Sequence, residues 1–156
     1  MPSNYTIKDL TSETSAMNQM RNVVYHLIRF LQDKNLSNEE IRHRLKRMGK
    51  NIGDTQSRLY DFSYDSVESL IRRIYRVILG SKVEVIRENK IYVVEDKDCC
   101  LCKYHRVDIS VPCDTLIPAM VSEILKYNNV KSIDAYVFTS ESLGDISCIH
   151  KYEIVE

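Results

Sequence analysis

The sequence predicts an α+β fold in which helices pack on one face of an antiparallel sheet. In residues 1–80 the apolar side chains recur every three to four residues, which is helical spacing. In most of the remainder they alternate with polar side chains, as in half-buried strands. Runs of helices followed by runs of strands favour the α+β class. At this length we expect one domain, residues 1–156, with the element order ααα-ββ-(β)-α-ββ.

Three helices are expected in the first half of the chain. The first spans about residues 11–35 and has its apolar positions on one face. The second spans residues 37–59 and opens with a capping box, in which Ser37 is the N-cap and Glu40 is the N3 residue. The third spans residues 67–79 and is followed by a glycine, the usual residue just beyond a helix C-terminus.

The second half carries the strands and a fourth helix. Asn89 lies between the first two expected strands, where a hairpin turn needs a residue in the left-handed conformation. Pro118 falls within the first two turns of the expected fourth helix, which suits a helix start. The final strand alternates strictly, with Cys148 and His150 on one face. The expected strands are 83–86, 91–94, 104–109, 133–138 and 148–155, and the expected helix is 112–126.

Gly49 and Gly53 lie inside the second expected helix, where each costs about 1 kcal/mol relative to alanine. Both lie at the edge of the apolar stripe that contains Ile41 and Leu45. A helix that accepts two glycines on one edge is expected to let another backbone approach closely there. The alternative is that Gly49 ends the helix as the residue just beyond its C-terminus.

The segment 47–53, Arg-Met-Gly-Lys-Asn-Ile-Gly, resembles the second-helix signature of the TRAPP small-subunit family, whose members are components of a vesicle-tethering complex. Segments 61–80, 107–125 and 143–145 resemble the third helix, the strand-to-helix segment and the terminal hairpin of that family. The resemblance implies a TRAPP-like fold and a non-enzymatic interaction scaffold in membrane tethering, trafficking or small-GTPase regulation. Its implied partners are a second copy, another TRAPP-like subunit or a small GTPase. TRAPP subunits of the most similar type carry an acylated cysteine just before the third helix, and the corresponding region here, residues 59–62, contains Tyr60 and no cysteine.

The same resemblance implies dimerisation through the first two helices. If these helices pair with a second copy, six apolar side chains are candidate contacts and two glycines are candidate helix-packing positions. The alternative is that the six apolar side chains form the core of the monomer. The candidate contacts are Met17, Met20, Val24, Leu27, Ile41 and Leu45, and the helix-packing positions are Gly49 and Gly53.

The C-terminal half also resembles the 4-vinyl reductase domain, a hydrocarbon-binding module of prokaryotes. This resemblance rests on Cys113 ahead of the fourth helix and on segment 144–148, Gly-Asp-Ile-Ser-Cys. The alternative function is therefore a sensor that binds a hydrophobic small molecule or acyl chain between the helices and the sheet. In the simpler interpretation the residues that would line such a site are ordinary core. These residues are Ile71, Ile74, Tyr75, Val121 and Phe138.

Cys99 and Cys102 form a C-x-x-C pair, and with Cys113 and Cys148 they supply enough thiolates for a tetrahedral zinc site. A second C-x-x-C pair, which would make the pattern specific, is absent from the sequence. The 4-vinyl reductase resemblance implies ligands at Cys113 and Cys148. The simpler interpretation is that the cysteines are small buried apolar side chains and that the protein has no cofactor. Because no nucleophile motif accompanies these cysteines, we expect no thiol enzyme.

The charge pattern limits the partners. The formal net charge is zero, which argues against a nucleic-acid binder. Residues 1–80 carry 13 Lys and Arg against 9 Asp and Glu, and the remainder carries 9 against 13, which gives +4 and −4. A basic half can face an acidic partner or a membrane surface, or can be a solvated helix face.

We expect no transmembrane segment, since no apolar run is long enough, and no signal-peptide pattern is present. Five cysteines without an export signal indicate reduced thiols and a cytoplasmic protein, peripheral at membranes if it acts there.

Overall fold

The computed structural model describes residues 7–97, 99, 101, 112–139 and 147–155. Within them, the helices and strands follow the order that the spacing of apolar residues predicts. The helices are α1 (Ile7–Asp33), α2 (Asn38–Leu59), α3 (Val67–Ile74), the π-helical turn η1 (Tyr75–Leu79) and α4 (Pro112–Tyr127). The strands are β1 (Val83–Glu88), β2 (Ile91–Asp96), β3 (Lys131–Thr139) and β4 (Cys148–Val155).

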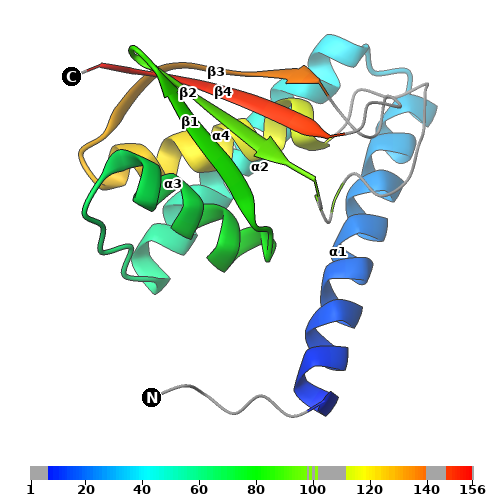
Figure 1. Cartoon of the computed structure of the whole chain (residues 1–156). Helices are drawn as coiled ribbons and strands as arrows, with labels where there is room; N and C mark the ends of the chain where they lie inside the picture. The colour runs from blue at the N-terminus through cyan, green and yellow to red at the C-terminus, as the bar shows by residue number, and fades with distance from the viewer. Residues whose placement is uncertain (1–6, 98, 100, 102–111, 140–146, 156) are drawn as a thin grey trace.

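The strands of the described residues form one antiparallel sheet with the order β1-β2-β4-β3 (Figure 1). The register between β2 and β4 places Val94 opposite His150. Burial alternates along β4, with Cys148 and His150 on the covered face, as the sequence pattern predicts. One face of the sheet therefore carries the buried side chains and is covered by other parts of the molecule.

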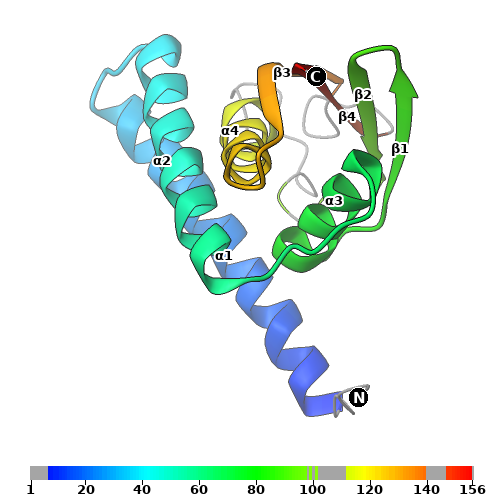
Figure 2. The ribbon, with the colours of Figure 1, turned by 90° about the vertical axis from the view of Figure 1, so that its left-hand side faces the viewer.

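Helices cover that face, as expected for the α+β class. α3 lies against β1, and α4 lies against β3 and β4. α2 packs on the side of α4 away from the sheet, so that α4 lies between α2 and the strands (Figure 2). α1 contacts α2, and its N-terminal half extends away from the rest of the molecule in both views. The α+β prediction is confirmed, with α4 as the central helix.

Local sequence signals set several of the element ends. The capping box is present: the Ser37 hydroxyl accepts from the backbone N–H of Glu40, and the Glu40 carboxylate accepts from the backbone N–H of Ser37 at 2.8 Å. Asn89 adopts a φ of 59° in the β1–β2 turn, the left-handed conformation that the hairpin needs. Gly80 has a φ of 65° directly after η1, which a side chain would disfavour.

Three features differ from the sequence prediction or lie beyond it. α1 begins at Ile7, earlier than the capping residues near position 11 predict. The third helix changes to a π-helical turn at Tyr75, and this wider turn keeps both Tyr75 and Leu79 buried. The strand predicted at 104–109 lies outside the described residues.

Candidate functional site

Gly49 and Gly53 lie where α2 meets α4. A Cβ built at Gly49 would lie less than 3.0 Å from the carbonyl oxygen of Leu116, and one at Gly53 would lie 2.6 Å from that of Met120. The predicted close approach of another backbone is therefore confirmed, and that backbone is α4 of the same chain. α2 continues to Leu59, so the alternative that Gly49 ends the helix is wrong. We call this contact, made by Gly49, Gly53, Leu116 and Met120, the glycine seam.

The glycine seam changes the interpretation of the predicted dimer contacts. Gly49 and Gly53 are buried against α4, so they pack helices within the chain and are not available to a second copy. Val24, Ile41 and Leu45 are buried in the core of the single chain as well. For these three side chains the assignment as dimer contacts is wrong, and the alternative of a monomer core holds. The physical reason is that an apolar helical stripe buries itself against the nearest layer of its own chain first.

A different row of apolar side chains on α1 faces solvent. Val23 and Phe30 expose 66% and 55% of their surfaces, and the half-buried Leu27 lies between them at helical spacing. We call Val23, Leu27 and Phe30 the α1 apolar row. Met20 falls in the same row by spacing, but the side chains of Met20 and Met17 lie outside the described part of the structure. The α1 apolar row is surface that the monomer leaves uncovered.

The residues predicted to line a hydrophobic site come together beneath the sheet. Ile71 and Ile74 of α3, Tyr75 of η1 and Val121 of α4 are fully buried in one apolar cluster. Phe138 belongs to β3, but its side chain lies outside the described part of the structure. Four of the five predicted residues therefore share one interior region, which is also what an ordinary core requires.

A polar group that the sequence analysis did not identify lies in this interior. The Tyr75 hydroxyl is 2.5 Å from Nδ1 of His150 and 2.6 Å from the hydroxyl of Tyr152. All three side chains are completely buried. The strict alternation of β4 already places His150 and Tyr152 on the covered face, so their polar atoms needed a partner there. That partner is supplied by η1, and no spacing pattern in the sequence connects positions 75 and 150.

Burial controls the ionisation of this group. Removal from water raises the pKa of the Tyr75 hydroxyl well above its ordinary value, and the neighbouring Tyr152, Asp96 and Cys99 raise it further. Burial also raises the pKa of Tyr152, partly offset by its hydrogen bond with Tyr75. Both phenols are therefore neutral at physiological pH and act as hydrogen-bonding dipoles rather than charges.

The cysteines predicted as zinc ligands are only partly placed. Cys99 and Cys148 are fully buried. Cys102 and the side chain of Cys113 lie outside the described part of the structure. Among the residues that are described, no group of three or more His, Cys, Asp or Glu side chains could hold a metal ion. The zinc site stays a prediction.

Comparison with known proteins identifies the fold. No protein-family model matches the sequence, and no curated protein matches it. A trafficking protein particle complex subunit 3 from Naegleria fowleri, crystallised covalently bound to palmitic acid, matches the structure with a TM-score of 0.67 at 14% identity. The match covers 90% of this chain and 96% of that one. This chain has a TRAPP-like fold.

A second solved structure matches the other resemblance drawn from the sequence. It is a vinyl-4-reductase family protein from Methanocaldococcus jannaschii, with a TM-score of 0.50 at 15% identity, covering 100% of this chain and 99% of that one. The TRAPP-like fold is thus shared between a trafficking-complex subunit and a vinyl-4-reductase family protein. At these identities the likeness establishes architecture, and function has to be argued from the residues.

Proposed function

We propose that this TRAPP-like chain is a non-enzymatic interaction scaffold whose α1 helix pairs with a second copy. The observation that carries the proposal is the α1 apolar row, because a helix in a folded monomer does not usually present a row of apolar side chains such as Val23 and Phe30 to water. Because Val23 and Phe30 are already exposed, a partner can reach this row without rearranging the core. The N-terminal half of α1, which precedes the row, extends away from the rest of the molecule (Figures 1 and 2). The predicted dimerisation through helices stays a prediction, in which Leu27 remains a candidate contact and Val23 and Phe30 are added to it.

The energetics favour pairing along this row. Fully burying side chains such as Val23 and Phe30 is worth about 1.5–3 kcal/mol each. The net charge of zero means that two copies do not repel each other strongly. A partner with the same row, either a second copy or a related TRAPP-like subunit, would bury the exposed apolar side chains of both α1 helices in one interface.

In this proposal the dimer is a structural unit of a larger assembly that tethers membranes or contacts a small GTPase. Within the described residues, no helix has both the length and the apolar character needed to cross a membrane. We propose that any association with membranes is peripheral and uses other subunits or the protein surface.

The dimer proposal predicts the oligomeric state of two variants. Light scattering coupled to size-exclusion chromatography is expected to give twice the chain mass for the wild type. The double variant Val23→Glu/Phe30→Glu is expected to give the monomer mass, because two carboxylates would have to be buried in the interface. The control is Ile86→Glu, which changes a side chain of similar exposure, 58%, on β1. A wild type that stays monomeric at tens of micromolar would rule out the self-pairing scaffold.

A second candidate function is the binding of a hydrophobic small molecule or acyl chain. Its support is the convergence of Ile71, Ile74 and Val121 around a buried polar group at Tyr75. An acyl chain would lie among the apolar side chains, and its polar end would meet the tyrosine and histidine. Because residues 59–62, just before the third helix, contain no cysteine that could be acylated, binding is expected to be non-covalent.

This candidate predicts a chain-length-dependent stabilisation. Added palmitate is expected to raise the melting temperature, whereas butyrate is not, because apolar burial grows with every methylene group. Native mass spectrometry of the purified protein is expected to show a lipid mass that disappears on denaturation, and the same spectrum reports any zinc. Equal responses to the two fatty acids, with no bound lipid, would exclude the sensor function.

A further inference from the structure

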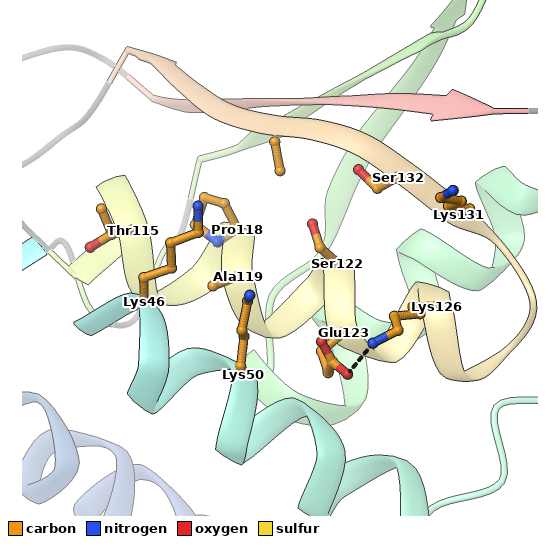
Figure 3. A pocket seen from close by; sticks show the side chains of 11 residues that line it. Lys46, Lys50, Thr115, Pro118, Ala119, Ser122, Glu123, Lys126, Lys131 and Ser132 are labelled. Carbon is orange, nitrogen blue, oxygen red and sulfur yellow. Dashed lines mark hydrogen bonds and ion pairs between the residues drawn. The ribbon is translucent and has the colours of Figure 1, made fainter. Parts of the chain in front are cut away.

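A pocket of about 340 Å³ lies on the far side of α4 from α3, between α2, α4 and β3 (Figure 3). Lys46 and Lys50 of α2 extend across the α4 surface toward it, and Lys131 borders it from β3. Its floor is the polar face of α4, which includes Thr115 and Ser122. The volume is within the range of small-molecule sites.

The pocket carries excess positive charge. Lysine side chains line it at four positions, and Glu123 is the single acidic residue among its lining residues. Glu123 is already paired with Lys126, at 3.2 Å. Within the described part of the chain, no ion pair engages Lys46, Lys50 or Lys131. Ammonium groups from two separate elements therefore border one concavity without a counter-charge.

The floor adds hydrogen-bond donors. Oγ1 of Thr115 and Oγ of Ser122 are shielded from water, and neither has a hydrogen-bond partner among the described residues. Buried hydroxyls that make no hydrogen bond cost roughly 1–3 kcal/mol each. A ligand that accepts hydrogen bonds, or a water molecule that enters with it, would relieve this cost after a rotation of the hydroxyl.

The glycine seam builds this pocket. Gly49 and Lys50 follow Lys46 by three and four residues, so both lie next to Lys46 on the surface of α2. Ala119 lines the pocket and would also meet a side chain placed at Gly49, at 3.1 Å. The glycines thus bring α2 close enough for its two lysines to reach over α4. The close packing of α2 on α4 therefore explains why the two lysines reach the pocket, but packing by itself does not require lysine at these positions.

We propose that this pocket binds the phosphate group of a small phosphorylated molecule. A phosphate group carries up to two negative charges and only acceptor oxygens, and the pocket lining offers lysine ammonium groups and hydroxyls that can donate hydrogen bonds to it. The volume leaves room beside the phosphate for a part of about the size of glycerol or a sugar. The phosphate is supplied either by a soluble phosphomonoester or by a phospholipid headgroup, and the two sources are separated by experiment.

The test compares phosphate binding by three forms of the full chain. The probes are inorganic phosphate and glycerol 3-phosphate, titrated by calorimetry, and phosphatidylcholine vesicles with and without phosphatidic acid, assayed by flotation. The pocket variant is Lys46→Gln/Lys50→Gln. The matched control is Lys82→Gln/Lys90→Gln, which removes the same charge from exposed lysines outside the pocket. Circular dichroism and melting temperature confirm that both variants fold.

The wild type is expected to bind glycerol 3-phosphate more tightly than inorganic phosphate. The pocket variant is expected to bind about tenfold or more weakly, since each lost charged hydrogen bond is worth more than 1 kcal/mol, and the control is expected to match the wild type. Binding only to vesicles with phosphatidic acid, lost in the pocket variant alone, would support the same pocket with a lipid headgroup as its source. No binding to any probe, or equal weakening in the pocket variant and the control, would overturn the proposal.

Discussion

Gly49→Ala is expected to lower the free energy of unfolding by about 3 kcal/mol, although alanine is the better helix former by about 1 kcal/mol. The new Cβ would lie less than 3.0 Å from the carbonyl oxygen of Leu116, which is a backbone atom of α4. Unlike the end of a flexible side chain, this oxygen cannot rotate away, so α2 and α4 would have to move apart. Because α4 also supports the sheet, the separation would disturb the core on both of its sides.

Urea unfolding followed by circular dichroism measures this effect, and two alanine variants serve as controls. Gly80→Ala places a Cβ in open space at a φ of 65°, so only the left-handed conformation is penalised, by about 1 kcal/mol. Asn51→Ala changes an exposed position of the same helix and is expected to shift stability by less than about 0.5 kcal/mol. If Gly49→Ala were as stable as the wild type, or more stable, the glycine seam would not be a close backbone contact in solution.

Raising the pH above 10 is expected to destabilise the protein steeply. The ordinary pKa of tyrosine is 10.0, and burial raises the pKa of both Tyr75 and Tyr152 above it. The unfolded chain therefore releases protons that the native state retains, so stability is complete below pH 10 and falls as the pH rises beyond it. Both tyrosines contribute to this loss, so the free energy of unfolding is expected to fall progressively as the pH rises from 10 toward 12.

The slope of unfolding free energy against pH tests this assignment. Tyr75→Phe is expected to reduce the slope by about one proton, whatever it costs in absolute stability through the lost contacts to His150 and Tyr152. The control Tyr60→Phe removes a phenol that is exposed instead of buried. Tyrosinate absorbance should show these two phenols ionising only as the chain unfolds. Ionisation of all tyrosines in the folded state would contradict the buried polar group.

Local sequence signals account for most of the element boundaries. Ser37 and Glu40 satisfy the first backbone N–H groups of α2 by themselves, so this helix start is readable without tertiary information. Asn89 and Gly80 mark chain reversals for an equally local reason, since each residue tolerates a positive φ. α1 begins at Ile7, earlier than the sequence predicts, because a helix can extend through a residue that is also able to cap it.

The functional surfaces were less predictable from the sequence. The spacing of apolar residues shows that a helix has an apolar face, but it does not show which segment or which second chain covers that face. The spacing around Val24 and Ile41 is the same whether the stripe meets another copy or the chain's own core, and the structure shows the core. Val23 and Phe30 became candidates only when the packed layers left them exposed. The lysines of the pocket gave only a basic helix face in the sequence, because their convergence with β3 depends on contacts far apart along the chain.

By itself, the sequence determined the α+β class, the helix caps and the presence of two glycines that demand a close backbone neighbour. These properties follow from interactions within a few residues, or from the repeat of apolar positions. The tertiary structure alone decided that the neighbour is α4, that Tyr75 meets His150, and that Lys46 and Lys50 reach a pocket floored by Ser122. Such pairings join segments far apart in the chain, and the free energy that selects them comes from packing the whole core, which no local pattern encodes.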